Sequence, residues 1–205
     1  MEGSGFRLVV WNCGGGFRRK RLVLQRLLPD IAIIPEASED FAQGLPRSSS
    51  LWIGAMLRPG LGIVAFNGWT LERADVDVTT RLFLPCVATR GTKRVQIVGV
   101  CAKKTTDYVS PTLDALQSLA HFIGAGPTVL AGDFNGSISF NRPIPFQFVL
   151  DRLDGLDMRS AWHQLRGENF GEETVPTYFM HWSDDPKRGH TSTMRSSQRT
   201  LAWKT

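Results

Sequence analysis

Residues 6–35 constrain the fold most, because they contain a strand, a helix and a second strand in close succession. The segment FRLVVW at 6–11 reads as a strand, and IAIIP at 31–35 reads as a buried strand. Between them, residues 18–28 place apolar side chains four apart, as in an amphipathic helix that Pro29 ends. Two strands joined by a crossover helix run parallel. The sequence therefore predicts an α/β domain that begins with a parallel pair of strands.

The rest of the chain continues as a mixture of strands and helices, with no internal repeat and no linker that would divide it. Strands are predicted over 51–57, 61–66, 82–89, 94–102 and 128–132, and helices over 110–124 and 145–156. Ser110 is the expected N-cap of the first of these helices, with Pro111 at its first helical position. We therefore predict one domain over residues 1–189.

The composition favours a folded protein with an anionic partner. Hydrophobic residues make up 42% of the chain and charged residues 21%, as in globular proteins, and no apolar run is long enough to cross a bilayer. The N-terminal residues lack the pattern of a signal peptide, and the three cysteines lack metal-ligand spacing, so we expect a cytoplasmic protein. The net charge of +5 suits nucleic acid or an acidic lipid headgroup.

Four side chains that carry oxygen atoms follow the ends of predicted strands. Asn12 follows the first strand and Glu36 the second, while Asp133 and Asn135 follow the strand within TVLAGDFNGS. The carboxyl ends of parallel strands share one edge of a sheet, where open α/β proteins bind ligands. Two carboxylates suit a hard divalent cation, Mg²⁺ or Mn²⁺, and the amides can orient a phosphate or a water molecule without adding negative charge.

Each of these residues also has a plain structural explanation when it is considered alone. Asn12 could cap the helix that follows it, and Glu36 could be a surface residue after Pro35. The segment GDFNG consists of residues that form turns. Their shared position at the ends of buried strands favours the functional interpretation over these separate explanations.

The segments VVWNCGGG, PDIAIIPE and GDFNG, in this order, resemble the endonuclease/exonuclease/phosphatase superfamily of metal-dependent phosphoesterases. The resemblance covers about residues 6–182. It implies an α/β fold, a four-layer sandwich in which two packed β-sheets are flanked by helices. It also implies that Glu36 binds the metal ion with Asn12 nearby, and that Asp133 and Asn135 position the attacking water and the phosphate.

The chain departs from that superfamily in two places. Members often carry a phosphate-contacting histidine after the strand that precedes the long helix, but this chain has VGVCAKKTTDY there. Lys103, Lys104 or Tyr108 would then contact the phosphate, and the alternative is that the lysines belong to a solvated loop. The final strand of the superfamily and its SDH element are also absent, so we expect the last strands of the sandwich to be missing.

Residues 190–205 are polar and lack strand periodicity, so we expect an aberrant, disordered tail. The codons of His190 to Ser196, read after skipping two bases, permit His-Ile-Asp-Tyr-Ala-Phe, which resembles the missing strand. We therefore hypothesise that a frameshift after about Gly189 replaced the C-terminus. An intact reading frame with no SDH codons downstream in any frame would refute this hypothesis.

The sequence thus predicts a Mg²⁺- or Mn²⁺-dependent phosphodiester hydrolase, with nucleic acid as the preferred substrate because of the basic balance and the tryptophan content. The alternatives are a phosphomonoesterase, a lipid-headgroup phosphodiesterase, or an inactive, truncated member that retains at most metal or polyanion binding. The segment FRRKR at 17–21 could bind backbone phosphates near the site, or it could be the solvated face of its helix.

Overall fold

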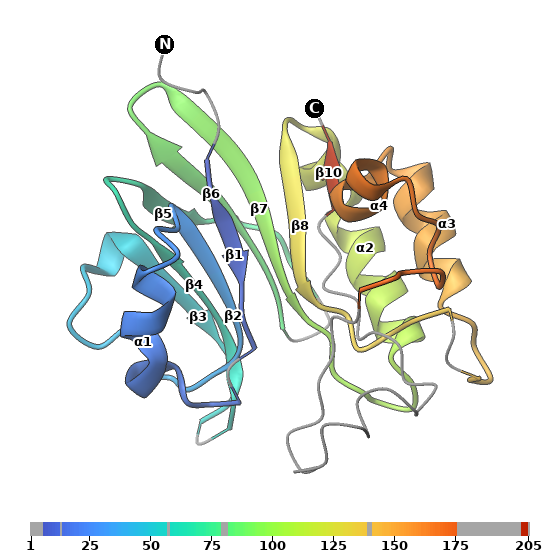
Figure 1. Ribbon diagram of the computed structural model, residues 1–205, viewed down its shortest axis with the longest axis horizontal. Helices are drawn as coiled ribbons and strands as arrows, with labels where there is room; N and C mark the ends of the chain where they lie inside the picture. The colour runs from blue at the N-terminus through green and yellow to red at the C-terminus, as the bar shows by residue number, and fades with distance from the viewer. Residues whose placement is uncertain are drawn as a thin grey trace.

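The computed structural model describes residues 6–12, 14–56, 58–78, 82–138 and 141–175, together with the backbone of residues 202–204. Two β-sheets pack face to face in this part of the chain (Figure 1). Helix α1 (Phe17–Gln25) covers the outer face of one sheet, and α2 (Val109–Gly124) and α3 (Gln147–Gly155) cover the other. The predicted sandwich of two sheets between helical layers is confirmed.

The first sheet contains the strand pair that the sequence predicted. Its strands, in spatial order, are β1 (Leu8–Val10), β2 (Ile31–Ala37), β4 (Gly60–Ala65) and β3 (Ser50–Ile53). β1 and β2 are parallel, with Leu8 opposite Ile31, as the crossover through α1 requires. The antiparallel strands β4 and β3 complete the sheet beyond β2.

Helix α1 is shorter than the sequence indicated. It ends at Gln25, and Leu28 has a φ of +48°, which no α-helix accommodates. Phe17 and Leu24 are buried, whereas Leu28 is 69% exposed. Leu24 therefore faces the core, whereas Leu28, four residues later, does not, because α1 ends before Leu28.

The second sheet contains six strands in the described part of the chain, of which three were not predicted. Their spatial order is β5 (Thr70–Arg73), β6 (Phe83–Arg90), β7 (Lys93–Cys101), β8 (Thr128–Asp133), β10 (Ala202–Lys204) and β9 (Arg159–Ser160). Sequence analysis located β6, β7 and β8 but missed β5, β9 and β10, which are short. β7 and β8 are parallel and are connected through α2, and Cys101 lies opposite Asp133.

Residues 202–204 correct the expectation for the end of the chain. They form β10, which runs antiparallel to β8 with Ala202 opposite Leu130. The expected tail outside the sheet is therefore wrong for these three residues. The physical reason is that β8 would otherwise expose a row of unpaired backbone groups, which a short extended segment can satisfy. The predicted boundary at residue 189 lies outside the described residues.

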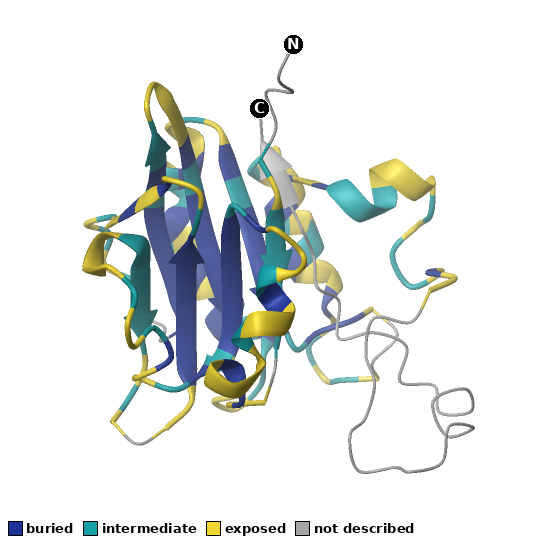
Figure 2. Ribbon diagram, turned by 60° about the vertical axis from the view of Figure 1, so that its left-hand side comes forward, coloured by how far each residue is buried: buried dark blue, intermediate teal, exposed yellow. Residues whose placement is uncertain are grey.

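Alternating side chains of the central strands fill two of the core layers. In β7, Ile97 faces the first sheet, whereas Val98 and Val100 face α2, as the two-residue period of a strand dictates. Figure 2 shows the buried strands as a continuous layer in the middle of the molecule. The two sheets approach closely at Gly99, where an added Cβ would lie 3.0 Å from the Cδ1 atom of Ile63.

The start of α2 differs in detail from the sequence prediction. Asp107, and not Ser110, supplies the capping oxygen: the Ser110 N–H donates to Asp107 Oδ1 at 2.6 Å and the Ser110 hydroxyl donates to Oδ2 at 2.9 Å. The hydrogen bond from the Ser110 N–H holds the pKa of Asp107 below its usual value.

None of the helices in the described segments has the length and apolar character that crossing a membrane demands.

Candidate active site

Glu36 lies at a β-bulge near the carboxyl end of β2. The pairing of β2 with β4 shifts register between Pro35 and Ala37, and Glu36 has a φ of +59°. A bulge redirects the side chain at its centre, and a non-glycine residue in the left-handed region is uncommon and often marks a functional site. The indole of Trp52 donates to the carbonyl oxygen of Ala37 at 3.0 Å and so helps to fix the strand beside the bulge.

A hydrogen bond joins the ends of the two sheets. The Nδ2 atom of Asn12, after β1, donates to Oδ2 of Asp133 at the end of β8, at 3.3 Å. The Oδ1 atom of the same asparagine accepts the N–H of Gly14 at 3.0 Å. The structure therefore brings together two predicted site residues that are 121 positions apart in the chain.

Asn135 is held against the same carboxylate. Its backbone N–H donates to Oδ1 of Asp133 at 3.0 Å, and its Nδ2 donates to the carbonyl oxygen of Ala102 at 3.0 Å. Its φ of +50° is one that asparagine tolerates better than most residues. Because both oxygen atoms of Asp133 accept a hydrogen bond, its carboxylate has a fixed orientation.

The buried thiol of Cys101 indicates where Glu36 lies relative to Asp133. β2 packs against β7 and β8. Burial raises the pKa of Cys101 to about 11; the charge of Lys103 and a backbone interaction with Glu36 lower it, and the carboxylates of Asp133 and Glu36 raise it. The charges of Lys103, Asp133 and Glu36 therefore all act on this one buried thiol.

The two buried thiols should not react in the folded protein. Burial raises the pKa of Cys86 to about 12 and that of Cys101 to about 11, so about one Cys101 thiol in a thousand is ionised at pH 8. In a Cys13→Ser variant, we expect a thiol reagent to label neither cysteine within minutes, and to label both after denaturation. Rapid labelling of the folded variant would contradict the described burial.

The lysines and the tyrosine proposed as phosphate contacts lie in different surroundings. Lys103 and Lys104 are exposed after β7, and Lys103 is the one whose charge acts on the Cys101 thiol. Tyr108 lies at the start of α2, where the guanidinium carbon of Arg142 is 4.9 Å from its ring centroid. Within the described part of the chain, no hydrogen bond joins Tyr108 to Asp133, whose oxygens accept from Asn12 and Asn135. Sequence analysis missed Arg142 because the segment around it has no periodic pattern.

The donor set at this edge fits a hard cation. Glu36 and Asp133 supply carboxylate oxygens, and Asn12 supplies an amide oxygen. No cluster of three or more His, Cys, Asp or Glu side chains suited to a metal occurs among residues whose placement is described. Mg²⁺ commonly takes only one or two carboxylates and keeps several water molecules, so two carboxylates are sufficient.

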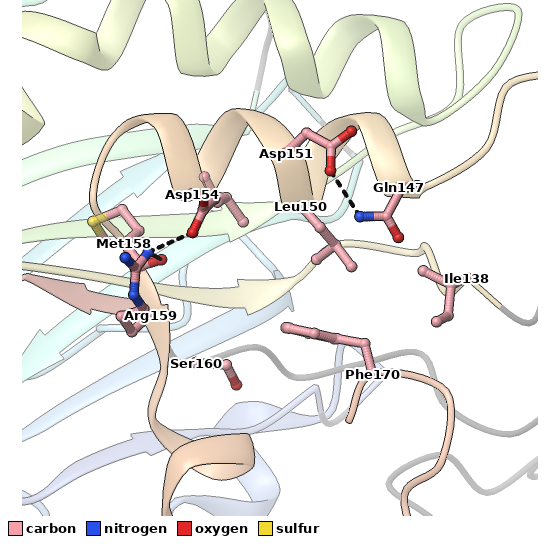
Figure 3. Close-up of a pocket in the computed structure, with 10 residues that line it drawn as sticks. Ile138, Gln147, Leu150, Asp151, Asp154, Met158, Arg159, Ser160 and Phe170 are labelled. Carbon is pink, nitrogen blue, oxygen red and sulfur yellow. Dashed lines mark hydrogen bonds and ion pairs between the residues drawn. The ribbon is translucent and has the colours of Figure 1, made fainter. Parts of the chain in front are cut away.

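A second feature lies among residues that were not predicted to act. A cavity of about 420 Å³ opens between α3 and Phe170 (Figure 3). Ser160, which lines it, caps α4 (Ala161–Arg166), and its hydroxyl lies 2.6 Å from Nδ1 of His163. Nε2 of the same histidine lies 3.1 Å from Oε1 of Glu173. These contacts tie the start of α4 to the segment that follows it and give His163 a structural role.

Comparisons with known proteins give structural matches alone. No family model matches the chain, and no curated protein is similar enough in sequence to be matched. The endonuclease domain of TRAS1, a telomere-specific non-LTR retrotransposon, matches with a TM-score of 0.67 at 14% identity over 98% of this chain and 85% of that domain. An AP endonuclease from Archaeoglobus fulgidus matches with a TM-score of 0.60 at 15% identity over 97% and 86%. D. rerio TDP2, complexed with a single-strand DNA product, matches with a TM-score of 0.57 at 15% identity over 82% and 72%.

These matches define the fold of the chain. The chain shares the fold of these solved structures, and the four-layer sandwich that the sequence resemblance implies is confirmed. At identities of 14% and 15%, the likeness extends to the arrangement of strands and helices. The activity and the roles of the site residues therefore require their own tests.

Proposed function

We propose that this protein is a divalent-metal-dependent phosphodiester hydrolase that acts on nucleic acid. The observation that carries the proposal is the hydrogen bond between Asn12 and Asp133, which joins the two sheets at the edge where Glu36 lies. The net charge of +5 supports a polyanionic substrate. Proteins of the same fold include endonucleases and a protein solved with a DNA product, which supports the same substrate class.

In this proposal, Glu36 holds the metal ion with Asn12 beside it, and Asp133 orients the attacking water. A bound Mg²⁺ or Mn²⁺ ion supplies positive charge that polarises the phosphoryl group and stabilises the leaving oxygen. Asp133 accepts a proton from the water molecule while the oxygen of that water forms a bond to phosphorus. The phosphorus–oxygen bond on the opposite side then breaks, and the leaving oxygen takes a proton from solvent. Asn135 and Lys103 contact the phosphate oxygens.

Nicking of supercoiled DNA in the presence of Mg²⁺ tests the proposal. We expect the protein to nick DNA, and we expect EDTA or the substitution Glu36→Gln to lower the rate at least about 100-fold, because a bound metal ion contributes several kcal/mol to such a reaction. Glu39→Gln makes the same chemical change at an exposed position after β2 and should leave the rate unchanged. Equal rates for the wild-type protein and Glu36→Gln would contradict the proposal.

The absence of an SDH element favours a second candidate, an inactive member that retains at most metal or polyanion binding. A version with the shifted frame restored after Gly189 separates the two candidates. Nicking by the restored version alone would support the inactive candidate and the frameshift. If the protein hydrolyses a phosphomonoester or a lipid headgroup faster than DNA, that compound class, and not nucleic acid, is its preferred substrate.

A further inference from the structure

Helix α1 presents consecutive basic residues beside the candidate active site. They are Arg18, Arg19, Lys20 and Arg21, and the first turn of the helix contains no acidic residue. The first three are exposed to solvent and the fourth is half-buried. Because α1 follows the loop that begins at Asn12, this basic segment starts at the same edge of the molecule as the site.

A cavity of about 460 Å³ separates the basic segment from the end of β2. It is lined by Gly15, Gly16, Arg18, Arg19, Ser38 and Asp40. Ser38 is two residues beyond Glu36 in the chain, and a Cβ added to Gly15 would lie 3.9 Å from the carbonyl oxygen of Glu36. The cavity is therefore a direct neighbour of the strand end that carries the proposed metal ligand.

The charged side chains that line this cavity differ in whether they form ion pairs. Nη1 of Arg18 lies 2.6 Å from Oδ2 of Asp40, whose other oxygen accepts the Ser38 hydroxyl at 2.7 Å. These contacts compensate the one negative charge among the lining residues. Arg19, by contrast, forms no hydrogen bond or ion pair with any residue in the described segments, so its guanidinium remains available to an external anion.

We infer that Arg19 and the cavity beside it bind a backbone phosphate of a nucleic-acid substrate, next to the phosphate that is cleaved. The inference rests on the proposed function, because the cleaved phosphate must lie at Glu36 for its neighbour to reach Arg19. Nucleic acid presents one phosphate for about every 3.4 Å of axis on each strand, so a strand at Glu36 also offers phosphates to the surface beside it. Contacts of this kind position the substrate and do not read its sequence.

The substitution Arg19→Ala tests the inference, with Arg26→Ala as the matched control. Arg26 is exposed at the opposite end of α1, so both variants lose the same charge from the same helix. We expect Arg19→Ala to bind DNA about threefold more weakly than the wild-type protein, or to have a KM for DNA that is about threefold higher. We also expect the slope of log affinity against log salt concentration to fall by about the value of one phosphate contact. Hydrolysis of bis(p-nitrophenyl) phosphate, which has no neighbouring phosphate, should be unchanged in both variants.

Binding of a labelled single-stranded oligonucleotide in EDTA gives a readout that does not depend on catalysis. Equal DNA affinity for Arg19→Ala and the wild-type protein would overturn the inference, and so would an equal loss for Arg26→Ala. An equal loss on the small diester would place Arg19 at the cleaved phosphate and would overturn it as well. Failure of the proposed function would appear separately, as cleavage that does not depend on Glu36.

Discussion

Replacing Asp133 with asparagine should lower Mg²⁺-dependent cleavage of DNA by at least about 100-fold while the protein stays folded. Both carboxylate oxygens now accept hydrogen bonds, one from Nδ2 of Asn12 and one from the N–H of Asn135. An asparagine has one oxygen for these two donors, so its amide nitrogen would face either the amide nitrogen of Asn12 or the N–H of Asn135. The variant therefore loses the group that takes the proton from water and also one of the two hydrogen bonds that fix its orientation.

Asp151→Asn is the matched control for this prediction. Asp151 is exposed on α3, where its Oδ1 accepts the side chain of Gln147 at 2.8 Å, and it is absent from the candidate site. The rate of this variant should equal that of the wild-type protein. Circular dichroism and thermal unfolding check that both variants are folded. A rate for Asp133→Asn within about threefold of wild type would remove Asp133 from the mechanism, since general base catalysis contributes at least about 100-fold.

The position of the candidate site was predictable because it depends on strand direction. A strand, a helix and a strand at the start of the chain imply a parallel pair, and this places Asn12 and Glu36 at one edge without any knowledge of packing. The contact of Asn12 with Asp133 is different in kind. It depends on how two separate sheets lie against each other, and hydrophobic periodicity within a strand carries no such information. The resemblance to a known superfamily supplied that part of the prediction.

Details that depend on local geometry or on distant partners were beyond the sequence patterns. Nothing in PDIAIIPE signals that Glu36 adopts a φ of +59° at a bulge, because the bulge is defined by the register with β4. The three residues of β10 are too few to show a period, and β8 determines their pairing. One partner of His163, Ser160, ends a strand of two residues, and the other, Glu173, lies in a segment with no regular pattern, so the role of His163 was invisible in the sequence.

Replacing Gly132 with alanine should lower the free energy of unfolding by about 3 kcal/mol or more. Gly132 precedes Asp133 in β8 and has a φ of +151°. A Cβ atom there would lie 1.9 Å from the carbonyl oxygen of Val100 and 2.7 Å from its nitrogen. Both atoms belong to the backbone of β7, which cannot move aside without breaking the parallel pairing that sets Cys101 opposite Asp133. We therefore expect the substitution to damage the fold and the candidate site together.

Gly124→Ala provides the control, because Gly124 is the last residue of α2 and an added Cβ would meet nothing within 4 Å. Alanine should be neutral there or stabilising by up to about 1 kcal/mol, since it restricts the unfolded chain. Urea denaturation followed by tryptophan fluorescence measures both variants. A Gly132→Ala protein as stable as Gly124→Ala would contradict the described approach of β8 to Val100. If it is destabilised as expected, its DNA cleavage should also fall under conditions where it is still folded, because β8, the strand that carries the added Cβ, also carries Asp133.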